Sequence, residues 1–329
     1  SAGPGNHELL RDLGAMSRRR RYTIACLSGR GVGPELMAEA SRALAEVSHL
    51  HGFGIDELHA PFGDEAVAAG GHPLPAGTRA ATSRADAILV AAMREPALAG
   101  VKAQLDLAAS VTSVRLRPGG ELTVFAPLIE GADEWAIERA FAAARARCGR
   151  LTSVGTTPEW RERVAATAGA HEGVTVRHLT LAEALPVLST HPSRIDVLVT
   201  ERVLADALAE VPQAQPGGTR IAAAGALSPN GPGVFGPTHG PAHDIAGQGV
   251  ANPSEMLLAA SLMLGEGLGR RSAAQTLESG IAAALGAPKR TADVAGAGVA
   301  ATTREFVDVV LGLLSSVRTD TELAPEPVA

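Results

Sequence analysis

The sequence predicts an α/β fold, because short apolar runs alternate along it with longer segments of helical period. Residues 22–27 and 87–92 have the length and the apolar character of buried strands. The first run breaks at the glycine-rich sequence GRGVG (29–33) and gives way to a helix, whose first turn accommodates Pro34. Apolar residues at positions 36, 40, 44 and 47 then give this helix one apolar face.

The rest of the chain continues the alternation. Further strands are predicted at residues 151–154 and 195–200, and further helices at residues 134–147, at 202–211 and from 255 onward. Between 212 and 253 the composition shifts to Gly, Pro and Asn, which predicts a long loop that is either functional or disordered. Residues 1–18 are predicted to be a disordered leader or tag, and residues 321–329 a disordered tail.

Composition and charge exclude several classes of partner. The net charge of -6 and the pI near 5.9 argue against a nucleic-acid-binding surface. Since no run approaches about 18 apolar residues, no membrane association is expected. Cys26 and Cys148 are the only cysteines, which predicts buried thiols in a reducing compartment rather than a disulfide framework. A cytoplasmic protein is therefore expected.

The Gly/Pro-rich segment contains the sequence GPTHGPAHDIAGQGVANP (236–253). It resembles the nucleotide-binding loop of the isopropylmalate/isocitrate dehydrogenase family, the β-decarboxylating dehydrogenases, whose pattern is EPxHGSAPDIAGxGxANP. GRGVGPE (29–35) resembles the family's GDGIGPE, and TERVLAD (200–206) its TENLFGD. RTAD (290–293) and TTREF (302–306) resemble its RTxD and TTxEF segments, so that the resemblance spans about residues 20–315.

The resemblance implies an isopropylmalate dehydrogenase-like two-domain α/β fold, with mixed sheets flanked by helices, rather than a standard Rossmann fold. It assigns residues 19–105 and 232–320 to a nucleotide-binding domain, and residues 106–231 to a shortened second domain for dimerisation and substrate binding. The family forms dimers, so a homodimer is implied. The shortened segment between 118 and 134 leaves a different oligomer open.

The resemblance also implies NAD as the cofactor. Asp244 stands where NAD-using members carry an aspartate, and an acidic side chain there accepts hydrogen bonds from the ribose 2′-hydroxyl and repels a 2′-phosphate. His239 is expected at the adenine, with a loop histidine satisfied by backbone as the alternative, and Asn252 at an adenine edge. One departure is Gly236, where the family has a glutamate. The implied cofactor-binding set is His239, Gly240, Asp244, Ile245, Ala246 and Asn252.

Two proton-transfer groups of the family are missing. The general base is a lysine after a T-S-V-D strand, but TSV (152–154) is followed here by Gly155 and Thr156. The only lysines are Lys102 and Lys289, and the only tyrosine, Tyr22, belongs to the first predicted strand, so no tyrosine stands at the family's proton-donor position. Each loss costs roughly 10²–10⁴ in rate. The catalytic residues are therefore unknown, and the family's oxidative decarboxylation is not expected.

The substrate arginines of the family are also altered. One falls on Ala126, one near Lys102, and one on Thr112 or displaced to Arg115 or Arg117. Lys102 keeps a charge without the two-pronged grip of a guanidinium. The substrate-binding candidates are Lys102, Arg115 and Arg117, although the alternation of the two arginines on a strand equally suits a solvated face.

The metal site is partly retained. Asp206 and Glu210 match the family's two helix carboxylates, and their i, i+4 spacing places them on one face, as a shared Mg²⁺ or Mn²⁺ requires. A third ligand from the partner subunit would lie near Glu183. A solvated helix face is the alternative.

Three hypotheses follow for the function. The first is a divergent NAD-dependent oxidoreductase acting on an unknown small hydroxy substrate. The second is a catalytically inactive NAD-binding pseudoenzyme or regulatory subunit that pairs with a catalytic paralogue. The third is a binding module without nucleotide. In the first, the candidates for a replacement base are His72, His178, His191 and His243.

Overall fold

The computed structural model describes residues 20–94, 96–116, 119–214, 221–295 and 299–322. The predicted leader lies outside these residues. So does the predicted tail except for residues 321 and 322, which continue the last helix.

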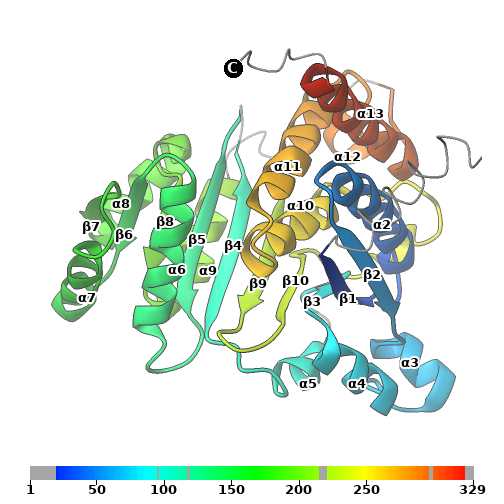
Figure 1. Ribbon diagram of the computed structural model, residues 1–329, viewed down its shortest axis with the longest axis horizontal. Helices are drawn as coiled ribbons and strands as arrows, with labels where there is room; N and C mark the ends of the chain where they lie inside the picture. The colour runs from blue at the N-terminus through cyan, green and yellow to red at the C-terminus, as the bar shows by residue number, and fades with distance from the viewer. Residues whose placement is uncertain (1–19, 95, 117–118, 215–220, 296–298, 323–329) are drawn as a thin grey trace, which may run out of the picture.

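In the described part of the chain, ten strands form one continuous sheet in the order β2-β1-β3-β10-β9-β4-β5-β8-β6-β7 (Figure 1). β4 pairs antiparallel with both β5 and β9, and β9 pairs antiparallel with β10, whereas the other pairs are parallel. The prediction of a mixed sheet is confirmed. The strands are β1 (Arg21–Leu27), β2 (Gly54–His59), β3 (Ala87–Val90), β4 (Ala109–Arg115), β5 (Glu121–Pro127), β6 (Arg150–Val154), β7 (Thr175–Leu179), β8 (Val197–Thr200), β9 (Ala222–Leu227) and β10 (Gly233–Pro237).

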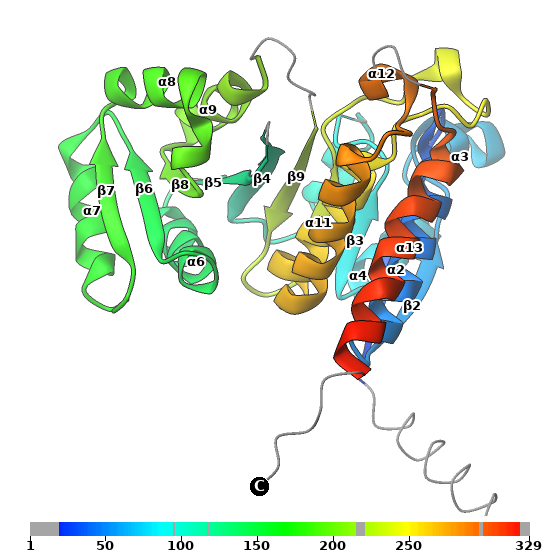
Figure 2. The same ribbon diagram turned by 90° about the horizontal axis from the view of Figure 1, so that it is seen from above.

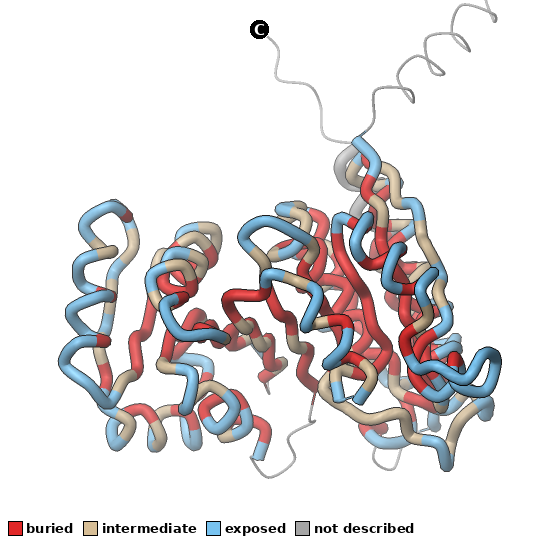
Figure 3. Tube along the Cα trace, turned by 90° about the horizontal axis from the view of Figure 1, so that it is seen from below, coloured by how far each residue is buried: buried red, intermediate tan, exposed pale blue. Residues whose placement is uncertain are grey.

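Helices cover both faces of this sheet, so the molecule has three layers (Figure 2). One face carries α2 (Gly33–Leu50), α6 (Asp133–Ala146), α7 (Pro158–Ala168), α10 (Ser254–Leu262), α11 (Arg271–Gly286) and α13 (Thr303–Glu322). The other carries α3 (Gly63–Gly70), α4 (Ala76–Arg84), α5 (Leu98–Lys102), α8 (Leu181–Thr190) and α9 (Ala205–Glu210). Figure 3 shows the strands as a buried layer, while the helices expose their outer surfaces. These two faces are called below the α2 face and the α9 face.

The predicted long loop between 212 and 253 is wrong in part, because β9 and β10 lie within it. β9 is rich in alanine and glycine, which gives little local strand signal, and it becomes a strand because β4 and β10 pair with it on both sides. Cys26 is buried as predicted, but Cys148 is exposed, because it lies where the chain turns between α6 and β6. Among the described residues, no helix combines the length and apolarity needed to cross a membrane.

Candidate functional site

The loop that follows β10 is docked on the glycine turn that follows β1. Val32 N donates to Pro241 O at 2.9 Å, and Gly249 N donates to Glu35 Oε2 at 3.4 Å. Gly31 has a φ of +69°, and a Cβ atom there would lie 1.8 Å from Pro241 O. A glycine is therefore required at the point where the two loops touch.

Glu255, in the first turn of α10, holds the start of the loop that follows β10. Its Oε2 accepts hydrogen bonds from Thr238 N at 2.9 Å, from Thr238 Oγ1 at 3.1 Å and from His239 N at 3.1 Å. Burial raises the pKa of Glu255, and these hydrogen bonds oppose the rise. No sequence motif predicted a role for this residue. The available signal was an acidic side chain directly after the loop, in the first turn of a helix.

His239 carries a buried polar atom without a partner. Its Nδ1 lies 2.8 Å from Gly240 O and must hold the proton, because a carbonyl oxygen only accepts hydrogen bonds. In the neutral ring Nε2 is then an acceptor, and this atom is buried without a hydrogen-bond partner. An acceptor of this kind suits the amino group of an adenine, so this position fits the expected nucleotide.

The other predicted loop residues differ in their exposure to solvent and in their packing. Asp244 is exposed in the short turn η4 (His243–Ile245), which follows Ala242 in a left-handed conformation with a φ of 41°. Gly240 and Ala246 are half-buried beside it, and Ile245 packs against the main core cluster.

Asn252 has structural partners. Its Nδ2 donates to Asp293 Oδ2 at 2.8 Å, and its Oδ1 accepts from Ser254 N at 2.9 Å at the start of α10. The side chain therefore anchors the end of the loop, and one amide hydrogen is left for a ligand.

Gly236, where the family pattern has a glutamate, has no room for a side chain. A Cβ atom would lie 2.6 Å from Val90 Cγ2 and 2.7 Å from Val90 O. Glu255 supplies a carboxylate close to this position instead. Its Oε2 accepts hydrogen bonds from the backbone of Thr238 and His239, which follow Gly236 by two and three residues.

The positions of the family's aspartate and lysine are closed by other contacts. A Cβ atom on Gly155 would lie 2.2 Å from Trp160 Cδ1, so the buried indole of α7 occupies the space of an aspartate side chain. Thr156 Oγ1 donates to Glu201 Oε2 at 2.7 Å, and Thr157 Oγ1 donates to Glu201 Oε1 at 2.8 Å. Neither Trp160 nor Glu201 was predicted from the sequence, because neither belongs to the family's reacting residues.

One of the four candidate histidines lies near Thr156. A cavity of about 300 Å³ at the ends of β6 and β7 is lined by Thr156, Trp160, His178 and Glu183, among others. Burial is the larger cause that lowers the pKa of His178, and the positive charge of Arg161 is the smaller one. Its Nδ1 is buried without a hydrogen-bond partner.

The other candidate histidines lie elsewhere, and none of them lines this cavity. His72 accepts a hydrogen bond from Leu74 N, His191 contacts Thr190, and His243 is exposed in the loop that follows β10.

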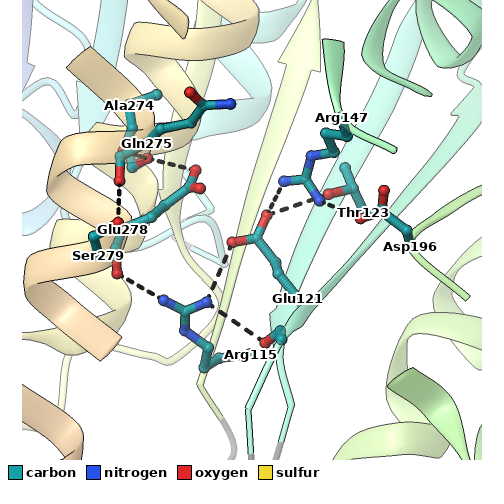
Figure 4. Close-up of polar contacts among 11 residues, drawn as sticks. Arg115, Glu121, Thr123, Arg147, Asp196, Ala274, Gln275, Glu278 and Ser279 are labelled. Atoms are coloured by element: carbon teal, nitrogen blue, oxygen red, sulfur yellow. Dashed lines mark hydrogen bonds and ion pairs between the residues drawn. The ribbon is translucent and has the colours of Figure 1, made fainter. Parts of the chain in front are cut away.

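The structure does not bring Arg115 together with the predicted metal residues. Arg115 lies at the end of β4 on the α2 face, where its Nη2 donates to the backbone oxygen of Glu278 at 2.7 Å and its Nη1 lies 3.8 Å from Glu121 Oε2 (Figure 4). Arg147 bridges Glu121 and Asp196 beside it. Arg115 is thus part of a half-buried ion-pair cluster, which lines a cavity of about 310 Å³. Arg117 lies outside the described residues.

This cluster predicts a pH-dependent stability. The pKa of Glu278 is raised from 4.5 to about 7, mainly by burial and to a smaller extent by the negative charge of Glu121. Since the folded chain holds this proton more tightly, the stability it contributes is present below about pH 4.5 and is lost as the pH rises through about 7. The lost contribution is on the order of 2–3 kcal/mol.

Glu278→Gln removes the titration while its side chain still accepts from Ser261 Oγ. Denaturant unfolding of both proteins at pH 5 and pH 8 checks this prediction. From pH 5 to pH 8, the free energy of unfolding of Glu278→Gln is expected to rise relative to that of the wild type by roughly 2–3 kcal/mol. A difference that does not change with pH would contradict it.

Lys102, Asp206 and Glu210 lie on helices of the α9 face. Lys102 ends α5, and burial lowers its pKa. Asp206 and Glu210 are both exposed, one turn apart on α9, which fits two ligands of a hard divalent cation. Glu183 is engaged in the capping box of α8, where its Oε2 accepts from Thr180 N at 2.8 Å.

Comparison with known proteins places this geometry in a family. The sequence model of the isocitrate/isopropylmalate dehydrogenase family matches residues 23–128 and 130–310. The chain belongs to this family. It is 31% identical to a 3-isopropylmalate dehydrogenase of a Synechococcus species over 83% of this chain and 94% of that protein. It is 33% identical to the 3-isopropylmalate dehydrogenase of Salinibacter ruber over 85% of this chain and 92% of that protein.

Solved structures agree with the family's fold. A β-decarboxylating dehydrogenase from Thermococcus kodakarensis, in its apo form, superposes with a TM-score of 0.78. The match has 23% identity and covers 93% of this chain and 99% of that chain. The isocitrate dehydrogenase of Methylococcus capsulatus gives a TM-score of 0.74 at 21% identity, over 89% and 99% of the two chains. The predicted isopropylmalate dehydrogenase-like fold is thereby confirmed.

Proposed function

We propose that this member of the isocitrate/isopropylmalate dehydrogenase family is a divergent NAD-dependent oxidoreductase. It acts on a small hydroxy compound and does not carry out oxidative decarboxylation. The docked nucleotide loop carries the proposal, because it is held by the glycine turn and by Glu255 while His239 Nε2 stays without a partner. The exposed Asp244 is free to accept hydrogen bonds from a ribose and disfavours a 2′-phosphate. We further propose a homodimer.

The altered residues indicate how the chemistry differs. NAD⁺ supplies the hydride acceptor when it is bound, and the chain must then take the proton of the substrate hydroxyl. His178 is the candidate for this step, because its lowered pKa keeps the ring neutral and able to accept a proton at neutral pH. It shares a cavity with Thr156, which stands at the family's lysine position. Because β7 is at the far end of the sheet from β10, His178 would serve a nucleotide bound by the other subunit of the proposed homodimer. Asp206 and Glu210 would hold Mg²⁺ or Mn²⁺ and orient the substrate oxygen.

A second candidate function is a catalytically inactive NAD-binding subunit that pairs with a catalytic paralogue. The contact of Trp160 over Gly155 and the hydrogen bonds from Thr156 to Glu201 favour it, because both close positions that the family uses for chemistry. A panel of 2-hydroxy acids, diols and alcohols separates the two functions. NAD⁺ reduction with any of them supports the oxidoreductase. No turnover by the pure chain, but turnover by a co-expressed paralogue that needs this chain, supports the subunit.

Calorimetric titration tests the cofactor. We expect NAD⁺ to bind more tightly than NADP⁺, and Asp244→Ala to weaken NAD⁺ binding by roughly 10- to 100-fold, because a charged hydrogen bond contributes about 1.5–3 kcal/mol. The substitution lies in an exposed turn, so folding should be unchanged.

Asp64→Ala, at an exposed aspartate in the first turn of α3, is the matched control and should bind NAD⁺ like the wild type. Equal binding by the wild type and Asp244→Ala would remove Asp244 from the site. No binding of either nucleotide would remove the proposal.

A further inference from the structure

A cysteine, a glutamate and a histidine meet at the edge of the sheet, away from the nucleotide loop. Cys26 on β1 is in register with His59 on β2, and Glu57 lies two residues before His59, so all three side chains leave the same face. This is the α2 face, because Cys26 belongs to the core cluster that α2 covers. One donor atom from each residue lies within 4.8 Å of the other two. In the described part of the chain, no other three His, Cys, Asp or Glu side chains come this close.

Neighbouring groups already hold two of the three side chains in place. Ser41 Oγ, on α2, donates to Glu57 Oε2 at 2.7 Å. His59 Nε2 lies 2.9 Å from the same carboxylate oxygen. A hydrogen bond from a neighbour that orients a ligand is a common feature of metal sites. The arrangement therefore has both donors and an orienting group.

We propose that Cys26, Glu57 and His59 form a binding site for a borderline divalent transition-metal ion of the Zn²⁺ class. A thiolate and an imidazole favour such an ion over Mg²⁺ or Mn²⁺, which prefer oxygen ligands. The site is thus chemically different from the Asp206 and Glu210 pair and lies on the opposite face of the sheet. It is also independent of the proposed oxidoreductase function.

The geometry allows one ion to reach all three donors. With metal–ligand distances of about 2.0–2.3 Å, donors in a tetrahedral site lie roughly 3.4–3.6 Å apart. Small side-chain movements suffice to reach this spacing from the present one. The His59 side chain is 56% exposed on an edge strand, so it can move. The same exposure leaves a fourth coordination position open to water.

A bound ion would join the edge strand β2 to β1, next to the α2 residue Ser41 that orients Glu57. The register of Cys26 with His59 places the two donors on neighbouring strands, so the ion would bridge them.

Cobalt titration tests the site on the full chain, free of any tag, reduced and treated with a chelator. We expect one Co²⁺ per chain, with a thiolate-to-cobalt charge-transfer band and with visible bands typical of four-coordinate cobalt. One equivalent of Zn²⁺ should displace it, and excess Mg²⁺ should not. His59→Gln and Glu57→Gln should each weaken Co²⁺ binding at least tenfold, and Cys26→Ser should abolish the charge-transfer band.

Cys148→Ser is the matched control, because Cys148 is the only other cysteine and its Sγ lies 3.0 Å from Asp196 Oδ2. This variant should bind Co²⁺ like the wild type. If the band is lost in Cys148→Ser, or persists in Cys26→Ser, the proposal is wrong. If the buried Cys26→Ser variant does not fold, the exposed His59→Gln variant decides: Co²⁺ affinity equal to that of the wild type overturns the site.

Discussion

Replacing Gly31 with alanine should cost about 4 kcal/mol of stability and abolish NAD⁺ binding at concentrations that saturate the wild type. Three costs add up. Alanine in a left-handed backbone conformation costs roughly 1 kcal/mol, overpacking costs about 1–3 kcal/mol, and a lost hydrogen bond costs about 1 kcal/mol. The overpacking arises because the new Cβ would lie 1.8 Å from Pro241 O, a backbone atom that cannot turn away. The hydrogen bond at risk runs from Val32 N to this same oxygen. Denaturant unfolding and calorimetric titration measure the two losses.

Gly29→Ala is the matched control for this prediction. Gly29 also has a positive φ, of +61°, but nothing lies within 4 Å of a Cβ atom there. It should therefore lose only about 1 kcal/mol and keep its NAD⁺ affinity. Equal losses in the two variants would show that the contact with Pro241 is unimportant and that only the backbone conformation matters.

Restoring the family's aspartate by Gly155→Asp should also destabilise the protein by about 4 kcal/mol and should not create activity. The new side chain would meet the buried Trp160 ring, and overpacking costs roughly 1–3 kcal/mol before the burial of a carboxylate is added. Thr156→Lys alone should be tolerated better, because Thr156 is exposed, although its hydrogen bond to Glu201 is lost. Denaturant unfolding measures stability, and NAD⁺ reduction with 3-isopropylmalate measures activity.

A double-mutant cycle checks the cause of that loss. Trp160→Ala alone should cost about 3–5 kcal/mol, because it leaves a cavity. In the Trp160→Ala background the added cost of Gly155→Asp should fall to about 1 kcal/mol, since the obstructing ring is gone. Additive losses would mean that the ring does not exclude the aspartate. 3-Isopropylmalate oxidation by Gly155→Asp/Thr156→Lys would show that this region can still support the family's reaction.

Much of the candidate site could be predicted from the sequence because its signals are local. The loop motif from 236 to 253 and the glycine turn from 29 to 33 are contiguous runs, and the structure places them in contact. The i, i+4 spacing of Asp206 and Glu210 likewise determines that they share a helix face. Counting residue types was enough to predict that the family's lysine and tyrosine have no counterpart, since the chain has two lysines and one tyrosine.

Other features depend on residues that are distant in the sequence, so only the tertiary structure decided them. β9 becomes a strand through its neighbours, and Trp160 fills the space above Gly155. Arg115 pairs with Glu121 and donates to the backbone oxygen of Glu278 on α11. Cys26 and His59 are 33 residues apart and meet only because β1 and β2 pair in register. The sequence by itself determined the family and the α/β class, because the motifs and the alternation of apolar runs are local patterns. Which side chains share a site depended on the packing of strands and helices, since contacts between distant segments leave no local pattern.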